Sequence, residues 1–151
     1  MTRSEAVSLA QRLRAGGGTI VFTNGVFDLL HVGHVRYLQQ ARNLGSALIV
    51  GLNSDRSVRT IKGPGRPLTP QDERAEVLAA LASVDGVVIF DEATPYALIA
   101  AILPDVLVKG ADWAEDAIVG RDIVEGRGGR VVRIALEPGR STTALIEKIR
   151  Q

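Results

Sequence analysis

The sequence predicts a single α/β domain over residues 1–151, built on one doubly wound parallel sheet with helices on both faces. Five short apolar runs rich in β-branched residues recur along the chain, and helical patterns separate them. Within these runs polar and apolar residues do not alternate, which is typical of strands buried on both faces. The ligand of such a domain is expected beyond the carboxyl ends of the strands.

The predicted strands lie at 19–24, 47–53, 86–90, 105–109 and 130–136. A helix is expected to begin near His31, because Val35, Leu38 and Ala41 follow at every third position and would form one buried stripe.

Two further helices are predicted from their start signals. Thr69 is the expected N-cap of one, with Pro70 in its first position, and Thr94 and Pro95 start the next in the same way. Residues 54–68 show no clear period, and we expect a loop there that acts as a functional flap.

Composition excludes several classes of protein. The formal net charge at pH 7 is +1, so we expect neither a nucleic-acid nor a membrane partner. The absence of cysteine excludes disulfide frameworks, cysteine-based metal sites and thiol nucleophiles, and it suits a cytoplasmic protein. No apolar run is long enough for a signal peptide or a membrane span.

Three common motifs are also absent from the sequence. It contains no GxxxxGKS or GxxxxGKT phosphate loop, no GxGxxG after the first predicted strand and no GxSxG nucleophile elbow.

Both histidines lie where the first predicted strand passes through a glycine turn into a helix. His31 and His34 would share a face at the helix N-terminus, where N–H groups and the helix dipole favour an anion, and Gly33 leaves room between them. A phosphate there would meet two imidazole donors, as charge on a transferred phosphoryl group requires. Two alternatives stay open: a metal-ligand pair completed by carboxylates, and a purely structural role as cap or core residues.

The stretch GVFDLLHVGH closely resembles the GxFDxxHxGH motif of the cytidylyltransferase-like nucleotidyltransferases, which have a Rossmann-like fold. Further similar segments are NSD at 53–55, Lys62-Gly63, Arg66-Pro67, Glu73-Arg74, VKGADW at 108–113 and Ser141-Thr142-Thr143. Within that superfamily the chain looks most like the D-glycero-β-D-manno-heptose 1-phosphate adenylyltransferases, including the C-terminal domain of bifunctional heptose kinase/adenylyltransferases.

The resemblance implies transfer of the adenylyl group of ATP to a sugar 1-phosphate, with Mg²⁺ carried by the ATP, and a product used for lipopolysaccharide. It also implies a homo-oligomer. One alternative is a cytidylyltransferase acting on glycerol 3-phosphate or a related polyol phosphate. Another is a nucleotide-binding module without turnover.

The same resemblance assigns residues to the site. It makes His31, His34 and Lys62 catalytic, and gives Asp28 and Arg66, together with Lys62, to the sugar phosphate. The nucleotide-binding residues that it implies are Asn24, Gly25, Val26, Phe27, Gly33, Arg74, Lys109, Gly110, Asp112, Ser141 and Thr142.

Plainer alternatives remain for several of these residues: solvated charges for Lys62, Arg66 and Arg74, a turn for Asp112 and an N-cap for Ser141. Asp28 is the carboxylate nearest in sequence for magnesium, or it orients the loop.

The base is predicted to be adenine rather than cytosine. In glycerol-3-phosphate cytidylyltransferases the segment that ends in STT resembles RTxxISTT, and its arginine lies beside the nucleotide. This chain has Leu136 at the position of that arginine. An apolar residue there removes a donor for cytosine and offers a surface for the larger purine. Arg140, four residues later, could restore the charge.

Overall fold

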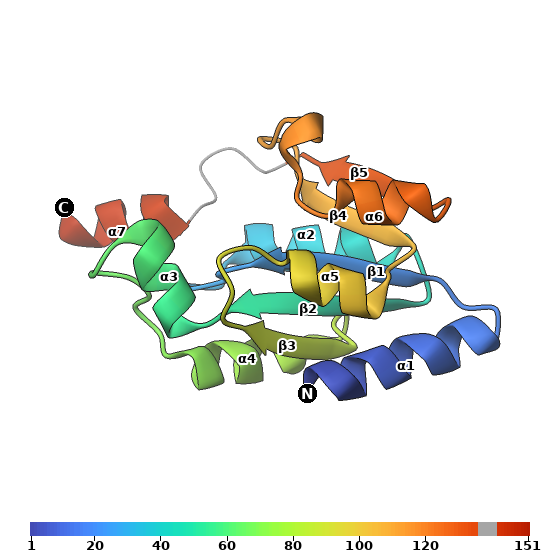
Figure 1. Cartoon of the computed structure of the whole chain (residues 1–151). Helices are drawn as coiled ribbons and strands as arrows, with labels where there is room; N and C mark the ends of the chain where they lie inside the picture. Colours follow the sequence, from blue (N-terminus) through green and yellow to red (C-terminus); the bar gives the residue numbers. More distant parts are fainter. Residues whose placement is uncertain (136–141) are drawn as a thin grey trace.

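A five-stranded parallel sheet forms the centre of the computed structural model, which describes residues 1–135 and 142–151 (Figure 1). The strands are β1 Ile20–Gly25, β2 Ala47–Asn53, β3 Gly86–Phe90, β4 Val106–Gly110 and β5 Arg130–Ile134. Their order across the sheet is β3-β2-β1-β4-β5. Successive strands are thus added on one side of β1 up to β3 and on its other side from β4 onward, and ligands bind sheets of this kind at that switch point between β1 and β4.

Helices cover both faces of the sheet (Figure 1). They are α1 Arg3–Ala15, α2 Val32–Arg42, α3 Asp55–Lys62, α4 Gln71–Ala79, α5 Tyr96–Ile102, α6 Arg121–Gly126 and α7 Thr142–Arg150, with a short 3-10 helix, η1, at Glu115–Ala117. Residues of α1, α5 and α6 pack on one face, and residues of α2 and α4 pack on the other. The helices α3 and α7 lie past the ends of the strands, at the left of Figure 1.

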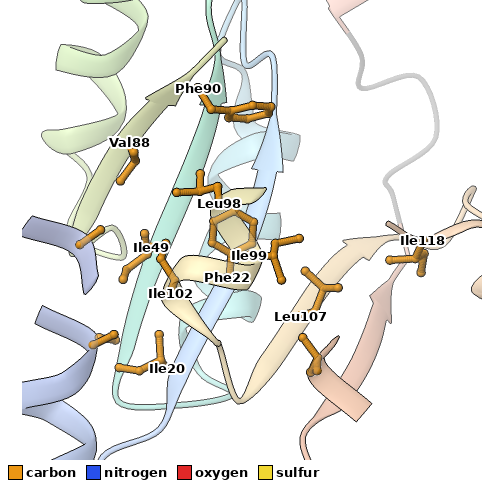
Figure 2. Packing of buried hydrophobic residues seen from close by; sticks show 14 residues of the cluster. Ile20, Phe22, Ile49, Val88, Phe90, Leu98, Ile99, Ile102, Leu107 and Ile118 are labelled. Atoms are coloured by element: carbon orange, nitrogen blue, oxygen red, sulfur yellow. The ribbon is translucent and has the colours of Figure 1, made fainter. Parts of the chain in front are cut away.

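Successive residues of β1 supply two separate cores. Ile20 and Phe22 pack in the cluster beneath α1, α5 and α6, which Figure 2 shows around Leu98 and Ile99. Val21, between them, points to the opposite face and joins the cluster beneath α2 and α4. All three side chains are fully buried. This two-sided burial explains why the strands are continuous apolar runs in the sequence.

The predicted fold class is confirmed, and each predicted strand is present with small shifts at its ends. The helix expected near His31 begins at Val32, with His31 as its N-cap. In that helix Leu38 and Ala41 are fully buried, as predicted, but Val35 is 42% exposed and does not belong to the buried stripe.

The prediction of an unstructured loop over 54–68 was wrong for its first half, which forms α3. Ser54 caps this helix by accepting the N–H of Ser57. Only Ser57 and Val58 are buried within α3, so the helix has too few apolar positions to show a period in the sequence.

The predicted helix starts at Thr69 and Thr94 were each one residue early. Pro70 and Pro95 are the N-cap residues of α4 and α5. The backbone N–H of Thr69 donates to Asp28 instead, which holds this residue outside the helix.

The helix α1 has no counterpart among the predicted elements. Thr2 and Glu5 form a capping box at its start, with the Thr2 side chain accepting the N–H of Glu5 and the Glu5 side chain accepting the N–H of Thr2. Within 1–135 and 142–151, no helix combines the length and apolar character needed to cross a bilayer.

Candidate functional site

A cavity of about 490 Å³ opens at the carboxyl ends of the strands. Its walls come from the end of β1 and the start of α2, from the ends of β2, α3 and β4, and from the start of α7. Its volume is in the range of small-molecule sites. The lining includes Asn24, Gly25, Val26, Phe27, Asp28, His31, Gly33, His34, Tyr37, Asn53, Ile61, Lys62, Arg66, Thr94, Lys109, Gly110, Asp112, Trp113 and Thr142.

The two histidines are stacked at the N-terminus of α2. Their ring centroids are 3.9 Å apart and their planes differ by 29°. Nδ1 of His31 accepts the backbone N–H of Gly33 at 3.0 Å, and Nδ1 of His34 accepts the backbone N–H of His31 at 3.3 Å. Because both Nδ1 atoms are acceptors, each neutral ring carries its proton on Nε2. Both histidines lie in the cavity lining, and Nε2 of His31 is buried.

His34 is held in its neutral form. Burial, together with the charge of His31, lowers its pKa from 6.5 to about 4. The ring of Phe27 meets that of His34 edge-on, with centroids 5.4 Å apart. At neutral pH the His34 ring is therefore a hydrogen-bond donor without a full charge.

Asp28, in the cavity lining, binds the segment that follows α3. Its carboxylate accepts the backbone N–H groups of Leu68 and Thr69 at 2.8 and 2.9 Å, and Nε–H of Arg66 at 3.2 Å. The Asp28 side chain is only 1% exposed. Of the three roles considered for Asp28, namely sugar-phosphate binding, magnesium binding and orienting the loop, these contacts support the last, which acts through the carboxylate.

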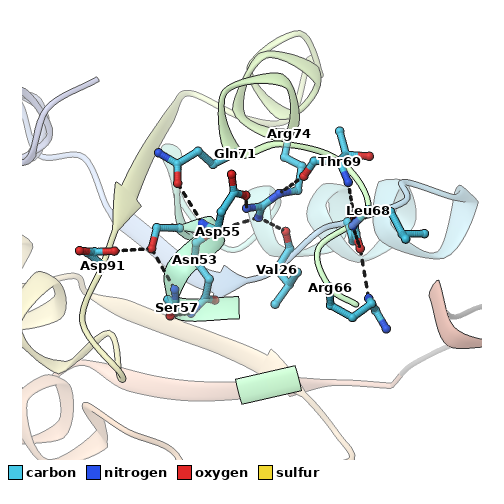
Figure 3. Close-up of polar contacts among 12 residues, drawn as sticks. Val26, Asn53, Asp55, Ser57, Arg66, Leu68, Thr69, Gln71, Arg74 and Asp91 are labelled. Carbon is cyan, nitrogen blue, oxygen red and sulfur yellow. Dashed lines mark hydrogen bonds and ion pairs between the residues drawn. The ribbon is translucent and has the colours of Figure 1, made fainter. Parts of the chain in front are cut away.

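Arg74 lies behind the cavity rather than in its lining. Its guanidinium donates to the carbonyls of Thr69, Val26 and Asn53 at 2.7–2.9 Å, and to the Asp55 carboxylate at 2.8 Å (Figure 3). The side chain is fully buried. We expected a phosphate contact here; the structure instead gives Arg74 a positioning role, because it joins the cavity loop to the starts of α3 and α4.

The end of β4 carries a cation beside an aromatic ring. Nζ of Lys109 lies 4.9 Å from the centroid of the Trp113 ring. Burial lowers the pKa of Lys109 to about 8, while the nearby Asp112 acts in the opposite direction. Both Lys109 and Asp112 line the cavity, at the edge of the sheet where the sequence placed them.

Tyr37 also lines the cavity but was not among the predicted site residues. Its hydroxyl lies 2.8 Å from Oγ1 of Thr23, which donates to the carbonyl of Val108, so the Tyr37 hydroxyl donates to Thr23. Burial, the main cause, raises the pKa of Tyr37 to about 12. Its helical position three residues after His34 was the signal in the sequence that could have placed it there.

The cavity brings together most of the predicted site residues, from segments spread over the chain. Arg74 is not in its lining, and Ser141, Leu136 and Arg140 lie outside the described residues. Thr142 is in the lining, and its hydroxyl donates to the carbonyl of Leu29 at 3.4 Å. In the described part of the chain, no three His, Cys, Asp or Glu side chains converge as a metal site.

The sequence matches a family model described as cytidylyltransferase-like over residues 22–148. Among curated proteins, the bifunctional protein HldE of Syntrophotalea carbinolica is 60% identical over 136 residues, which are 90% of this chain and 28% of that protein. HldE of Mesorhizobium japonicum is 55% identical over 147 residues, 97% of this chain and 30% of that protein. The chain thus spans under a third of the length of these relatives.

Two solved structures are similar in fold. A lipopolysaccharide core biosynthesis protein from Thermoplasma volcanium aligns with a TM-score of 0.66 and 26% identity, covering 80% of this chain and 98% of that one. A protein with unknown function from Archaeoglobus fulgidus aligns with a TM-score of 0.61 and 25% identity, covering 82% and 94%.

Proposed function

The chain belongs to the cytidylyltransferase-like family, and on this premise we propose that it transfers the adenylyl group of ATP to D-glycero-β-D-manno-heptose 1-phosphate. The products are ADP-heptose and pyrophosphate, and the ADP-heptose serves the lipopolysaccharide core. Support comes from 55–60% identity to HldE proteins and from the fold shared with a lipopolysaccharide core biosynthesis protein.

The observation that carries the proposal is the stacked pair of His31 and His34 in the cavity, with both Nδ1 atoms engaged by backbone N–H groups. In both neutral rings the proton is then on Nε2, at a helix N-terminus in the cavity lining. Such a site suits phosphate oxygens that gain charge during transfer. No protein nucleophile is required, because positioning and charge neutralisation supply most of the catalysis of phosphoryl transfer.

In the proposed reaction, an oxygen of the sugar phosphate attacks the α-phosphorus of ATP in line. A new phosphorus–oxygen bond forms, and the bond from the α-phosphorus to the oxygen that bridges to the β-phosphate breaks, so that pyrophosphate leaves with the bonding electrons. His31 and His34 donate to the α- and β-phosphates as the charge shifts. Lys62 and Arg66 lie in the lining at α3 and the segment after it, where they would hold the incoming phosphate.

Magnesium would enter with the triphosphate. The carboxylate of Asp28 is already used by Arg66 and two backbone N–H groups, so it is a poor magnesium ligand. The described residues therefore fit Mg²⁺ as an ion held mainly by phosphate and water oxygens, its usual mode with nucleotides. The bound ion would supply neutralisation of phosphate charge. Asp112, at the end of β4, is proposed to accept hydrogen bonds from the ribose hydroxyls.

We further propose that residues 1–151 act as one catalytic unit, in the cytoplasm and as a homo-oligomer. No nucleic acid or membrane is needed for the reaction.

The test is pyrophosphate release with ATP or CTP, each combined with the heptose 1-phosphate or with glycerol 3-phosphate. We expect turnover with ATP and the heptose 1-phosphate, and a kcat/KM at least about tenfold higher for ATP than for CTP, or about 1.4 kcal/mol. Preference for CTP with glycerol 3-phosphate would replace the proposal by a cytidylyltransferase. Nucleotide binding without turnover in any combination would indicate a binding module.

A further inference from the structure

Trp113 is the single tryptophan of the chain, and it lies in the cavity lining with 46% of its surface exposed. Its backbone is nonetheless anchored on both sides. The backbone N–H of Trp113 donates to the carbonyl of Gly110 at 3.1 Å, and its own carbonyl accepts Nη1–H of Arg133 at 3.1 Å. The backbone that carries this large aromatic ring is thus anchored at the cavity wall, and the ring belongs to neither of the two core clusters.

The ammonium of Lys109 lies over the Trp113 ring, 4.9 Å from its centroid. A cation in this position is attracted by the electrons of the ring and restrains its orientation. Since an aromatic ring has two faces and about half of this side chain is exposed, surface remains for a second flat partner. The ring is therefore a preorganised stacking surface, which lowers the entropic cost of binding.

The cavity has two ends of different chemistry. The histidine pair follows β1, whereas Asp112 and Trp113 follow β4, the strand that pairs directly with β1. Lys62 and Arg66 reach the cavity from α3 and the segment after it. A nucleoside triphosphate has its groups in a matching order: the polyanionic triphosphate at one end, then the ribose, then the flat heteroaromatic base.

Resting on the proposed function, we propose that Trp113 stacks on the nucleobase of the bound nucleotide and so determines affinity for the purine. With the phosphates at His31 and His34 and the ribose at Asp112, the base comes next along the cavity wall. The acceptor is the less suitable partner, because its phosphate requires the cations Lys62 and Arg66 on the side of α3. Stacking on an aromatic side chain favours the larger π-surface of adenine.

The first test uses the fluorescence of Trp113, which no other tryptophan obscures. Titration with ATP is expected to quench or shift the emission, whereas inorganic tripolyphosphate, which has no base, leaves it nearly unchanged. Equal responses to both ligands, with ATP binding verified by calorimetry, would overturn the assignment. If ATP does not bind at all, the proposed function and this inference fail together.

The second test separates the two substrates by kinetics. Trp113→Ala is expected to raise KM for ATP by roughly ten- to a hundredfold, the usual range for loss of base stacking, with kcat and KM for the sugar phosphate nearly unchanged. Trp113→Phe keeps a ring and is expected to retain most of the affinity. A raised KM for the sugar phosphate, with KM for ATP unaltered, would assign Trp113 to the sugar and overturn the proposal while the proposed function stands.

Discussion

The ring of Phe27 occupies the space that a side chain on Gly25 would need. A Cβ on Gly25 would lie 2.9 Å from Cε2 of Phe27, closer than real contacts allow. Phe27 itself has a φ of 46°, a backbone conformation uncommon for a bulky residue, and its ring supports His34 edge-on. The position of one histidine of the pair thus depends on the absence of a side chain two residues before Phe27.

Gly25→Ala is therefore expected to displace Phe27 and with it His34. We expect kcat to fall at least about tenfold and the free energy of unfolding to fall by about 1–3 kcal/mol, as for overpacking elsewhere. Kinetics and urea unfolding measure the two effects. Gly126→Ala is the matched control, because nothing lies within 4 Å of a Cβ there and the residue is in α6. Equal behaviour of the two variants would contradict the argument.

Loss of either histidine should remove transition-state stabilisation rather than the fold. We expect His34→Ala and His31→Ala to lower kcat by roughly 10²–10³, the scale of losing one such donor, with melting temperatures within a few degrees of the wild type. Because His31 is also the N-cap of α2, His31→Asn is the sharper variant: asparagine can cap the helix but has no Nε2–H. An active His31→Asn enzyme would show that His31 serves only as a cap.

The lowered pKa of His34 predicts a pH dependence of stability. Its pKa is about 4 in the folded protein and 6.5 without the fold, so between these values the unfolded chain binds more protons. The contribution of His34 to stability is complete above pH 6.5, is lost as the pH falls from 6.5 to 4, and changes no further below. Urea unfolding of the wild type and His34→Gln over this range measures the difference. Parallel curves for the two proteins would contradict the assigned pKa.

Asp28→Asn should loosen the segment that follows α3. The variant loses the negative charge that faces Arg66. Its amide has one acceptor oxygen where the carboxylate has two, so it cannot accept both the Leu68 and the Thr69 N–H groups as Asp28 does. We expect trypsin to cleave the variant after Lys62 faster than it cleaves the wild type. In the wild type, ATP with Mg²⁺ is expected to slow this cleavage. Mass spectrometry of the fragments gives the rate. Asp116→Asn, an exposed carboxylate in η1, is the control, and a cleavage rate at Lys62 equal in all three proteins would refute the role of Asp28.

Arg74→Lys tests the positioning role of the buried guanidinium. Lysine keeps the charge but cannot reach the acceptors on Val26, Asn53 and Thr69 together with Asp55. We expect the free energy of unfolding to fall by about 1–3 kcal/mol, the cost of leaving a buried carbonyl without its donor. Denaturant unfolding measures it. A variant of normal stability with only a raised KM for ATP would restore the phosphate contact expected from the sequence.

The sequence alone was sufficient to predict the elements whose signal lies in neighbouring residues. The strands were predictable because each is a continuous apolar run. The place of residues 24–34 at the cavity was predictable because the chain passes there from a strand through glycine into a helix. The start of α1 could also have been predicted, since Thr2 and Glu5 have the spacing of a capping box. The helix α3 was missed because only Ser57 and Val58 are buried within it.

Features that depend on distant contacts could not be predicted. Nothing local distinguishes Arg74 from an exposed helix arginine, since its acceptors are on Val26 and Asn53, 48 and 21 residues away. Trp113 was not predicted, although Lys109 and Asp112 of the same segment were, because its contact with the Lys109 ammonium is visible only in the structure.

The pairing of β4 with β1 sets an order of assembly. β1, β2 and β3 follow one another in sequence, but Val21 must meet Val106, 85 residues later. Contacts so far apart along the chain form late, because closing a long loop costs entropy before the contact compensates it. We therefore expect the proposed nucleotide site to form only when β4 docks on β1. In refolding experiments, protection of the β4 amide protons from exchange should appear together with the ability to bind ATP.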